Sequence, residues 1–236
     1  VVPWPEPHMW PIFAGAFVIH AVYKVLQAMT YTRGAYTVVY PVVRGTGPLF
    51  TFVAAGWVFA ETYTAGQWAG LGLLVGGILG LALYNLRHLT QGRDSLGPAL
   101  AFAVATGGLV AAYTTYDAYG IRATADPFTF LAWFFMIDGL FIPAVTARRW
   151  LALPRAEIAP LLGRGVLGAF VAYFSFGAIM LATRLDKVGE AATLRETSTV
   201  FAALIGWLVL GEKVGPARTA LMALIAAGAV MIEVMG

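Results

Sequence analysis

Eight long apolar runs dominate this chain of 236 residues and limit what it can fold into. A helix needs about 20 apolar residues to cross the ~30 Å hydrocarbon core of a bilayer. Only 11% of the residues are charged, against roughly 25% in an ordinary soluble domain, so the chain cannot cover its own surface in water. We therefore predict an all-α protein, a polytopic membrane helix bundle with eight transmembrane helices. The predicted spans are 10–32, 36–60, 66–86, 97–117, 126–147, 161–183, 188–211 and 216–235.

One hydrophobic unit occurs twice in the sequence. The run from Arg44 to Glu61, RGTGPLFTFVAAGWVFAE, matches the run from Arg195 to Glu212, RETSTVFAALIGWLVLGE, at an offset of 151 residues. A unit of five helices, an odd number, crosses the membrane in the opposite sense in its second copy. We therefore predict an inverted 5+5 repeat. Its first copy, 1–86, holds three helices and is N-terminally incomplete, and its second copy, 97–236, holds five, so two spans are expected before residue 1.

The composition argues against several kinds of site. The chain has no cysteine, and its histidines, His8, His20 and His88, lack metal-ligand spacing. Basic residues stand singly or in pairs at the ends of apolar runs, as loop charges on a membrane protein do. We therefore predict no catalytic residue, no metal ion, no cofactor and no nucleic-acid partner. The expected partners are the lipid bilayer and a small-molecule metabolite, and a homodimer stays an open alternative.

Two arginines inside the predicted spans carry the main functional prediction. An ionisable group deep in a span is unfavourable there, which makes each one a functional-site hypothesis. The planar guanidinium group suits carboxylate or phosphate, so we predict that Arg44 and Arg195 contact an anionic group of a solute in a central cavity. The alternative is that each arginine pairs permanently with an acid, Arg195 with Asp138 for instance, and fixes the packing of the helices.

The other charges inside the spans form a second tier. His20 and Lys24 lie one helical turn apart on one face, where they would line the cavity or relay a proton, or else form a polar patch between helices. Asp138 lies near the middle of its span, and Glu196 would carry a coupling proton or partner a basic residue. The predicted substrate-binding residues are Arg44, Arg195, His20, Lys24 and Asp138.

The segment YPVVRGTGP, residues 40–48, places two prolines and two glycines around Arg44. Proline removes a bond from the helical ladder, and a broken helix at membrane depth is tolerated where it lines a cavity. We expect a broken helix here, with an ordinary kink as the alternative. The second copy has Ala192 and Thr199 at the proline positions, so we expect no such break there.

Two further patterns predict how helices end and pack. Glu61 and Glu212 each close a span and precede a polar turn, and because acids favour helix N-termini we expect each to cap the following helix. Small residues at intervals of four allow close contact between membrane helices. We expect such a ridge at Gly72, Gly76 and Gly80, extended by Gly66 and Gly70.

The doubled pattern resembles the EamA-like drug/metabolite transporter superfamily. The resemblance lies in YPVVRGTGPLFTFVAAGWVFAE at 40–61 and LRETSTVFAALIGWLVLGEKVGPARTALMALIAAGAVMI at 194–232. It implies ten helices in two inverted units, of which this chain lacks the first two, and transport of amino acids or other small metabolites across the inner membrane of bacteria.

Together these features predict a secondary transporter that moves a small polar metabolite, an amino acid or other carboxylated solute, by alternating access. A membrane-embedded enzyme acting on lipid is one alternative, but it needs a reactive cluster near one interface. A non-transporting scaffold subunit is another, and it would have both arginines paired and no central cavity. Substrate, coupling ion and direction of transport stay open.

Overall fold

The computed structural model describes residues 2–88, 96–209 and 215–236, and every regular element within these ranges is a helix. This confirms the predicted all-α class. The helices are α1 (Met9–Arg33), α2 (Tyr36–Phe59), α3 (Ala65–Arg87), α4 (Leu96–Ala123), α5 (Pro127–Asp138), α6 (Phe141–Leu151), α7 (Arg155–Leu185), α8 (Val188–Glu196), α9 (Ser198–Leu208) and α10 (Pro216–Val234).

Seven membrane-length segments occur among the described residues, with α5 and α6 together forming the segment Pro127–Leu151. They confirm the predicted polytopic bundle. The predicted seventh span, 188–211, is wrong as a continuous helix, because α8 and α9 divide it and each is too short to cross a bilayer. Residues 210 and 211 lie outside the described part of the chain.

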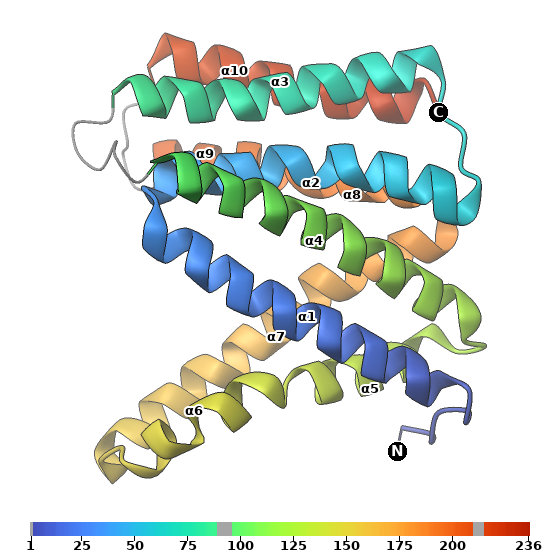
Figure 1. Ribbon diagram of the computed structural model, residues 1–236, viewed down its shortest axis with the longest axis vertical. Coiled ribbons are helices and arrows are strands. Elements are labelled where there is room, and N and C mark those ends of the chain that lie inside the picture. Colours follow the sequence, from blue (N-terminus) through green and yellow to red (C-terminus); the bar gives the residue numbers. More distant parts are fainter. Residues whose placement is uncertain (1, 89–95, 210–214) are drawn as a thin grey trace.

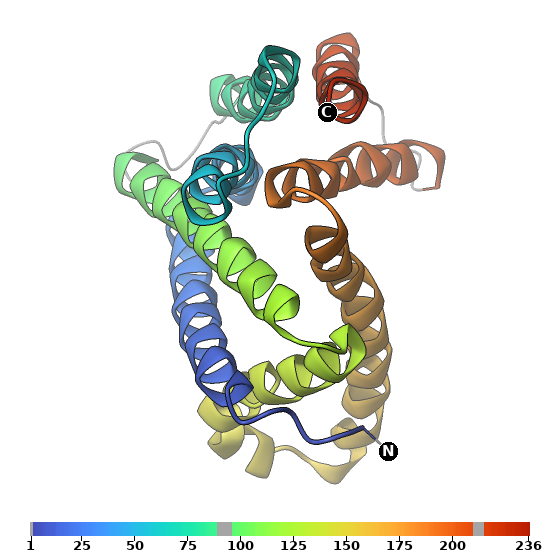
Figure 2. The same cartoon turned by 90° about the vertical axis from the view of Figure 1, so that its right-hand side faces the viewer.

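The helices stack in layers (Figure 1). Helices α3 and α10 lie side by side in the outermost layer, and α2 and α8 form the next. Helix α4 packs across α2, and α1 packs on α4. Figure 2 shows α7 on the side opposite α1 and α4, with α5 and α6 completing the far end of the bundle. The helices thus surround a central region bordered by α1, α2, α4 and α8.

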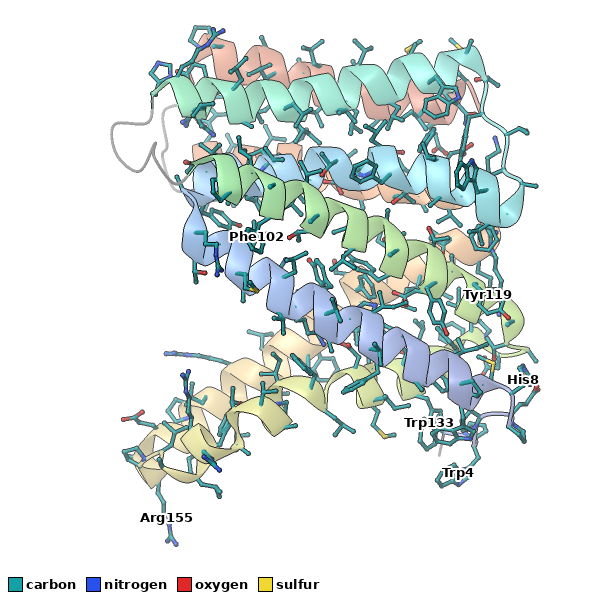
Figure 3. The ribbon with its side chains drawn as sticks, in the orientation of Figure 1. Trp4, His8, Phe102, Tyr119, Trp133 and Arg155 are labelled. Carbon is teal, nitrogen blue, oxygen red and sulfur yellow. The ribbon has the colours of Figure 1, made fainter. Side chains whose placement is uncertain are left out.

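The N-terminal segment and the α6–α7 turn lie at the same end of the bundle, on opposite sides of it in Figure 1. Trp133 donates its indole N–H to the carbonyl of Pro3 at 2.8 Å, and the rings of Trp4 and Trp133 lie 4.8 Å apart, which fixes the segment against α5 (Figure 3). Arg155, where α7 begins, projects away from the other helices. Large side chains along α7, such as Phe170 and Phe174, are exposed, as suits a surface that faces lipid.

Helix α2 is continuous through both prolines, so the predicted break at 40–48 is wrong. Pro41 cannot donate to the carbonyl of Thr37, but the side chain of Asn85 donates to that carbonyl at 2.8 Å. The backbone group freed by the proline therefore has a partner from α3. The hydroxyl of Thr46 also donates to the carbonyl of Val42 at 2.7 Å, within the helix.

The break lies in the second copy instead, at Thr197. The hydroxyl of Thr193 donates to the carbonyl of Glu190 at 2.8 Å, and the hydroxyl of Thr197 donates to the carbonyl of Leu194 at 2.7 Å. Hydroxyl side chains that bond to their own backbone compete with the helical ladder and bend it. The sequence TLRETST therefore ends α8 at Glu196 and begins α9 at Ser198.

Helices α3 and α10 touch through glycines, but only partly those predicted. A Cβ at Gly72 or Gly76 would meet nothing within 4 Å, whereas one at Gly70 would lie 2.9 Å from the carbonyl oxygen of Gly228. A Cβ at Gly77 would lie 2.8 Å from the carbonyl oxygen of Leu221. At the offset of 151 residues Gly70 corresponds to Leu221 and Gly77 corresponds to Gly228, so the two contacts are equivalent by the repeat. The predicted inverted repeat requires such an arrangement. The division into two repeats stays a prediction.

Glu61 caps a helix, but not the one that follows it. Its carboxylate accepts from the backbone N–H of Val188 at 2.9 Å and of Gly189 at 3.4 Å, at the start of α8. Arg122 of α4 lies 3.2 Å from the same carboxylate. Burial, and then the hydrogen bond to Glu61, raises the pKa of Tyr63, so its hydroxyl remains a donor to Glu61. Thr64 and Gln67 cap α3 through a capping box, which leaves Glu61 free to join α2 to α8. Glu212 lies outside the described residues.

Replacing Gly228 by alanine should loosen the contact between α3 and α10. The new Cβ would lie 2.6 Å from the carbonyl oxygen of Gly70, so the two backbones must separate, and overpacking of this kind lowers the free energy of unfolding by about 1–3 kcal/mol. Gly72→Ala on the open face of α3 is the control and should raise it by about 0.5–1 kcal/mol. Thermal unfolding in detergent measures both, and equal effects would contradict the contact.

Replacing Glu61 by alanine should also lower stability. The variant leaves two backbone N–H groups of α8 and the guanidinium of Arg122 without their shared acceptor, and the expected loss is about 1–3 kcal/mol. Glu157→Ala, at an exposed position in the first turn of α7, is the matched control and should lower the free energy of unfolding by less, at most about 1 kcal/mol, since it removes only an interaction with the helix N-terminus. An unchanged unfolding temperature in Glu61→Ala would show that the cap contributes nothing.

Candidate functional site

The two predicted arginines line one cavity of about 170 Å³. A water molecule occupies about 30 Å³ in the liquid, so this space suits a small solute. Arg44 enters it from α2 and Arg195 from α8, although 151 residues separate them. The other residues that line it are Tyr23, Gln27, Tyr31, Tyr40, Val43, Gly47, Val110, Tyr113 and Glu196. The cavity therefore combines two guanidinium groups with four tyrosine rings.

Glu196 is the shared partner of both arginines. Its Oε2 lies 3.1 Å from Nε of Arg44, and its Oε1 lies 3.4 Å from Nε of Arg195. Only 1% of the Glu196 side chain is exposed, against 22% for Arg44 and 12% for Arg195. The predicted alternative pairing of Arg195 with Asp138 is wrong. One buried carboxylate thus faces two guanidinium groups, which leaves one positive charge in excess at the cavity.

Further donors and acceptors complete the contacts of the arginine pair. Arg44 donates to the hydroxyl of Ser198 at 2.6 Å, just beyond the break between α8 and α9. Arg195 reaches the hydroxyls of Tyr113 and Thr114 on α4, each at 3.5 Å. The interruption at Thr197 therefore has a local consequence, because it brings Arg195, Glu196 and Ser198 to one place beside α2.

The second tier of predicted residues forms a separate cluster. Lys24 donates to Oδ1 of Asp138 at 2.6 Å and to its carbonyl at 3.1 Å. Nδ1 of His20 lies 3.9 Å from Oδ1 of Asp138. None of these three lines the cavity of the arginines, so the structure brings them to one another and not to Arg44. The prediction that His20, Lys24 and Asp138 contact the solute stays untested.

Asp117 is a member of this cluster that the sequence analysis missed. Its Oδ2 lies 2.9 Å from Nε2 of His20, and only 3% of its side chain is exposed. The predicted span 97–117 placed it at a helix end, whereas α4 continues to Ala123 and buries it. Tyr113 precedes it by one helical turn and faces both groups, because its ring lies 4.7 Å from that of His20 and its hydroxyl contacts Arg195. The sequence could have indicated this, because Tyr113 and Asp117 are spaced i and i+4 and share one face of a helix that extends beyond residue 117.

The C-terminal part of the chain matches a known family. The model of the EamA-like transporter family matches residues 97–234, more than half of the chain. This chain belongs to the EamA-like transporter family. It is accordingly an integral membrane protein of the drug/metabolite transporter type, as its apolar helices also indicate. A search of curated proteins finds no match.

Membership of the EamA-like transporter family favours transport over chemistry. Within residues 2–88, 96–209 and 215–236, no three His, Asp or Glu side chains are arranged to hold a metal ion. In the His20 cluster the ammonium of Lys24 lies 2.6 Å from Oδ1 of Asp138.

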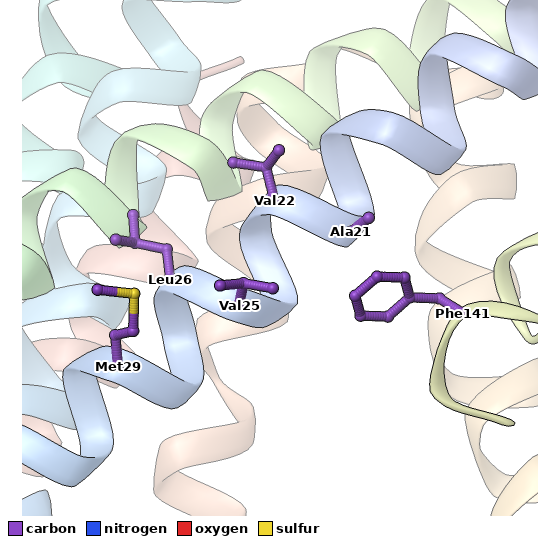
Figure 4. Close-up of a pocket in the computed structure, with 6 residues that line it drawn as sticks. All are labelled: Ala21, Val22, Val25, Leu26, Met29 and Phe141. Carbon is purple, nitrogen blue, oxygen red and sulfur yellow. The ribbon is translucent and has the colours of Figure 1, made fainter. Parts of the chain in front are cut away.

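A larger groove lies on the outer side of α1 and is a poor candidate for a polar solute. It measures about 390 Å³ and is lined by Ala21, Val22, Val25, Leu26, Met29 and Phe141 (Figure 4). Every one of these side chains is apolar, and in an EamA-like membrane protein such a surface suits hydrocarbon tails. The charged cavity is smaller, but it is the one with groups that recognise an anion.

Removing the shared carboxylate should destabilise the protein strongly. In Glu196→Ala two guanidinium groups lose their common partner, and breaking a buried ion pair lowers the free energy of unfolding by about 3 kcal/mol or more. Glu157→Ala, which removes an exposed acid from the first turn of α7, should lower it by at most about 1 kcal/mol. Adding Arg44→Gln to Glu196→Ala should recover part of the loss, because one uncompensated charge is removed. Thermal unfolding in detergent tests this, and a further loss in the double variant would contradict the shared pairing.

Proposed function

We propose that this chain is a secondary transporter that carries a small carboxylated solute, such as an amino acid, across the bacterial inner membrane by alternating access. Arg44 and Arg195 bind the carboxylate of the solute in the cavity between α1, α2, α4 and α8. The observation that supports this most directly is that both guanidinium groups face the same cavity and share a single carboxylate.

The charge balance of the cavity supports an anionic solute. Two guanidinium groups and one carboxylate leave a net positive charge, and a charge removed from water is stabilised by an opposite charge nearby. A guanidinium has five N–H donors in a planar fork, and the contacts to Glu196 and Ser198 use only some of those of Arg44. Donors therefore remain for a carboxylate of the solute.

The rest of the lining supports a solute that also has polar groups. Gln27 donates to the hydroxyl of Tyr23 at 2.6 Å and to that of Tyr31 at 3.4 Å. The ring of Tyr40 lies 5.6 Å from the guanidinium of Arg44. Tyrosines have an apolar ring and a polar hydroxyl, so these walls can contact both the polar and the apolar part of an amino acid.

The scaffold alternative predicted paired arginines without a cavity. The arginines are paired, as that alternative requires, but they also line a cavity of about 170 Å³. The lipid-enzyme alternative needs a reactive cluster near one interface, whereas His20 and Asp117 are buried between helices. A transporter needs both the cavity and charged groups that bind the solute there, so transport agrees with the paired arginines and with the cavity that they line. Membership of the EamA-like transporter family also supports transport.

Alternating access also needs contacts that close one side of the cavity and can break. Arg122 of α4 is suited to this role, because it donates to Glu61 at 3.2 Å, to the carbonyl of Thr183 at 2.8 Å and to that of Asp186 at 2.8 Å. These bonds join α4 to α2 and to the end of α7. In the proposed cycle they separate when the cavity opens towards this side.

Uptake of labelled L-amino acids into liposomes that contain the purified protein tests the proposal. We expect Arg44→Gln and Arg195→Gln each to reduce uptake at least tenfold, because the loss of one hydrogen-bonded charge partner weakens binding by about 2 kcal/mol or more. Arg87→Gln, at an exposed arginine at the end of α3, is the control and should transport normally. Normal uptake by a folded Arg44→Gln, Arg195→Gln double variant would rule out the arginine site.

A further inference from the structure

The cluster of His20, Lys24, Asp117 and Asp138 is a second buried polar site, beside the arginine cavity. It draws on three helices, with His20 and Lys24 from α1, Asp117 from α4 and Asp138 from α5. Both ring nitrogens of His20 face carboxylates, Nε2 at 2.9 Å from Asp117 and Nδ1 at 3.9 Å from Asp138. The ring therefore lies between two acids, and among the residues that the structure describes only Asp138 of these two has an ammonium partner.

We propose that this cluster is a proton-binding site, and that an anion bound at Arg44 and Arg195 increases its affinity for a proton. The proton is shared among His20, Asp117 and Asp138, and solute and proton bind together. This proposal rests on the proposed transport of an anionic solute, and it identifies the coupling ion as H⁺.

The charges of the two sites balance each other. With the His20 ring neutral, two carboxylates and the ammonium of Lys24 leave one negative charge in excess in the cluster. Two guanidinium groups and the carboxylate of Glu196 leave one positive charge in excess at the cavity. A bound anion uses up that positive charge. The negative charge of the cluster is then uncompensated, and in a medium of low dielectric constant a proton is the simplest group to neutralise it.

The two sites are close enough to interact. Tyr113 contacts both, with its ring 4.7 Å from that of His20 and its hydroxyl 3.5 Å from Nη1 of Arg195. Asp117, Thr114 and Arg195 also border one pocket of about 10 Å³, which approaches the space that one water molecule needs, about 10–15 Å³. Among the described residues, Oδ1 of Asp117 is buried and has no hydrogen-bond partner, so it can accept a proton or a hydrogen bond on that side.

Every helix packed around His20 presents a defined set of groups to it. Helix α1 contributes Lys24 and the hydroxyl of Tyr23, whose ring packs on that of Tyr113. Helix α4 contributes Tyr113 and Asp117, α5 contributes Asp138, and α8 contributes Arg195, paired with Glu196. Helix α7 faces His20 with the ring of Phe176. Of the two arginines of the cavity, Arg195 is therefore the one connected to His20 through a single residue, Tyr113.

The test needs no solute, because a substitution can make the same electrical change as a bound anion. Arg195→Gln and Arg44→Gln each remove one positive charge from the cavity, and Glu196→Gln adds one by removing a negative charge. Histidine ring NMR of the full chain in detergent follows the protonation of His20, and His20→Gln assigns its signal among those of His8 and His88.

We expect Arg195→Gln and Arg44→Gln to move the pH dependence of the His20 signal in one direction and Glu196→Gln to move it in the opposite direction, because the first two remove a positive charge and the third removes a negative one. Arg87→Gln should leave this pH dependence unchanged. Three variants keep the test available if one does not fold. An unchanged pH dependence, or shifts of the same sign in Arg195→Gln and Glu196→Gln, would overturn the proton site.

The liposome assay separates this proposal from the one it rests on. If uptake depends on the arginines but the pH dependence of the His20 signal is the same in all variants, the anion site is supported and the proton site is overturned. A pH dependence that moves as expected together with normal uptake in the arginine double variant would support the electrical coupling and overturn the transport role of the arginines. Asp117→Asn should abolish stimulation of uptake by an imposed pH gradient, and full stimulation in this variant would also contradict the proton site.

Discussion

A single buried carboxylate, that of Glu196, holds the polar centre of this bundle together. Arg44 comes from α2 and Arg195 from α8, and in a low-dielectric interior two guanidinium groups this close repel each other unless an acid lies between them. Glu196 meets that requirement with 1% of its side chain exposed. The position of α8 against α2, the cavity beside both helices and the charge left over for a solute all follow from this arrangement.

Backbone hydrogen bonding explains why the chain departs from simple membrane helices where it does. Inside a bilayer every carbonyl and N–H needs a partner from the protein. The side chain of Asn85 donates to the carbonyl of Thr37, which Pro41 leaves without its helical partner, and α2 stays continuous. In TLRETST the hydroxyls of Thr193 and Thr197 bond to the backbone, and the helix ends. In this chain α2 thus remains continuous through its two prolines, whereas α8 ends within the hydroxyl-rich sequence TLRETST.

The features that the sequence could predict depend on composition, on the length of apolar runs and on the repeat at an offset of 151 residues. Apolar runs are long enough to identify seven membrane segments, and the offset of 151 residues correctly related Arg44 to Arg195 as residues of one cavity. The partners of each charge could not be predicted, because they depend on which helices touch. Arg195 pairs with its sequence neighbour Glu196 and not with Asp138, and Glu61 caps α8, which begins 127 residues later. Asp117 is absent from the predicted site because the predicted span ends at residue 117, whereas α4 continues to Ala123 and buries this aspartate.

Helix α8 is attached differently at its two ends. Its first N–H groups are bound to Glu61, the residue that follows α2 and the C-cap Ala60, whereas its last residue gives way at Thr197 to a separate helix. A tilt of α2 would therefore move both ends of α8, its first turn through Glu61 and its last turn through the pairing of Glu196 with Arg44, so the geometry of the charged cavity depends on the orientation of α2.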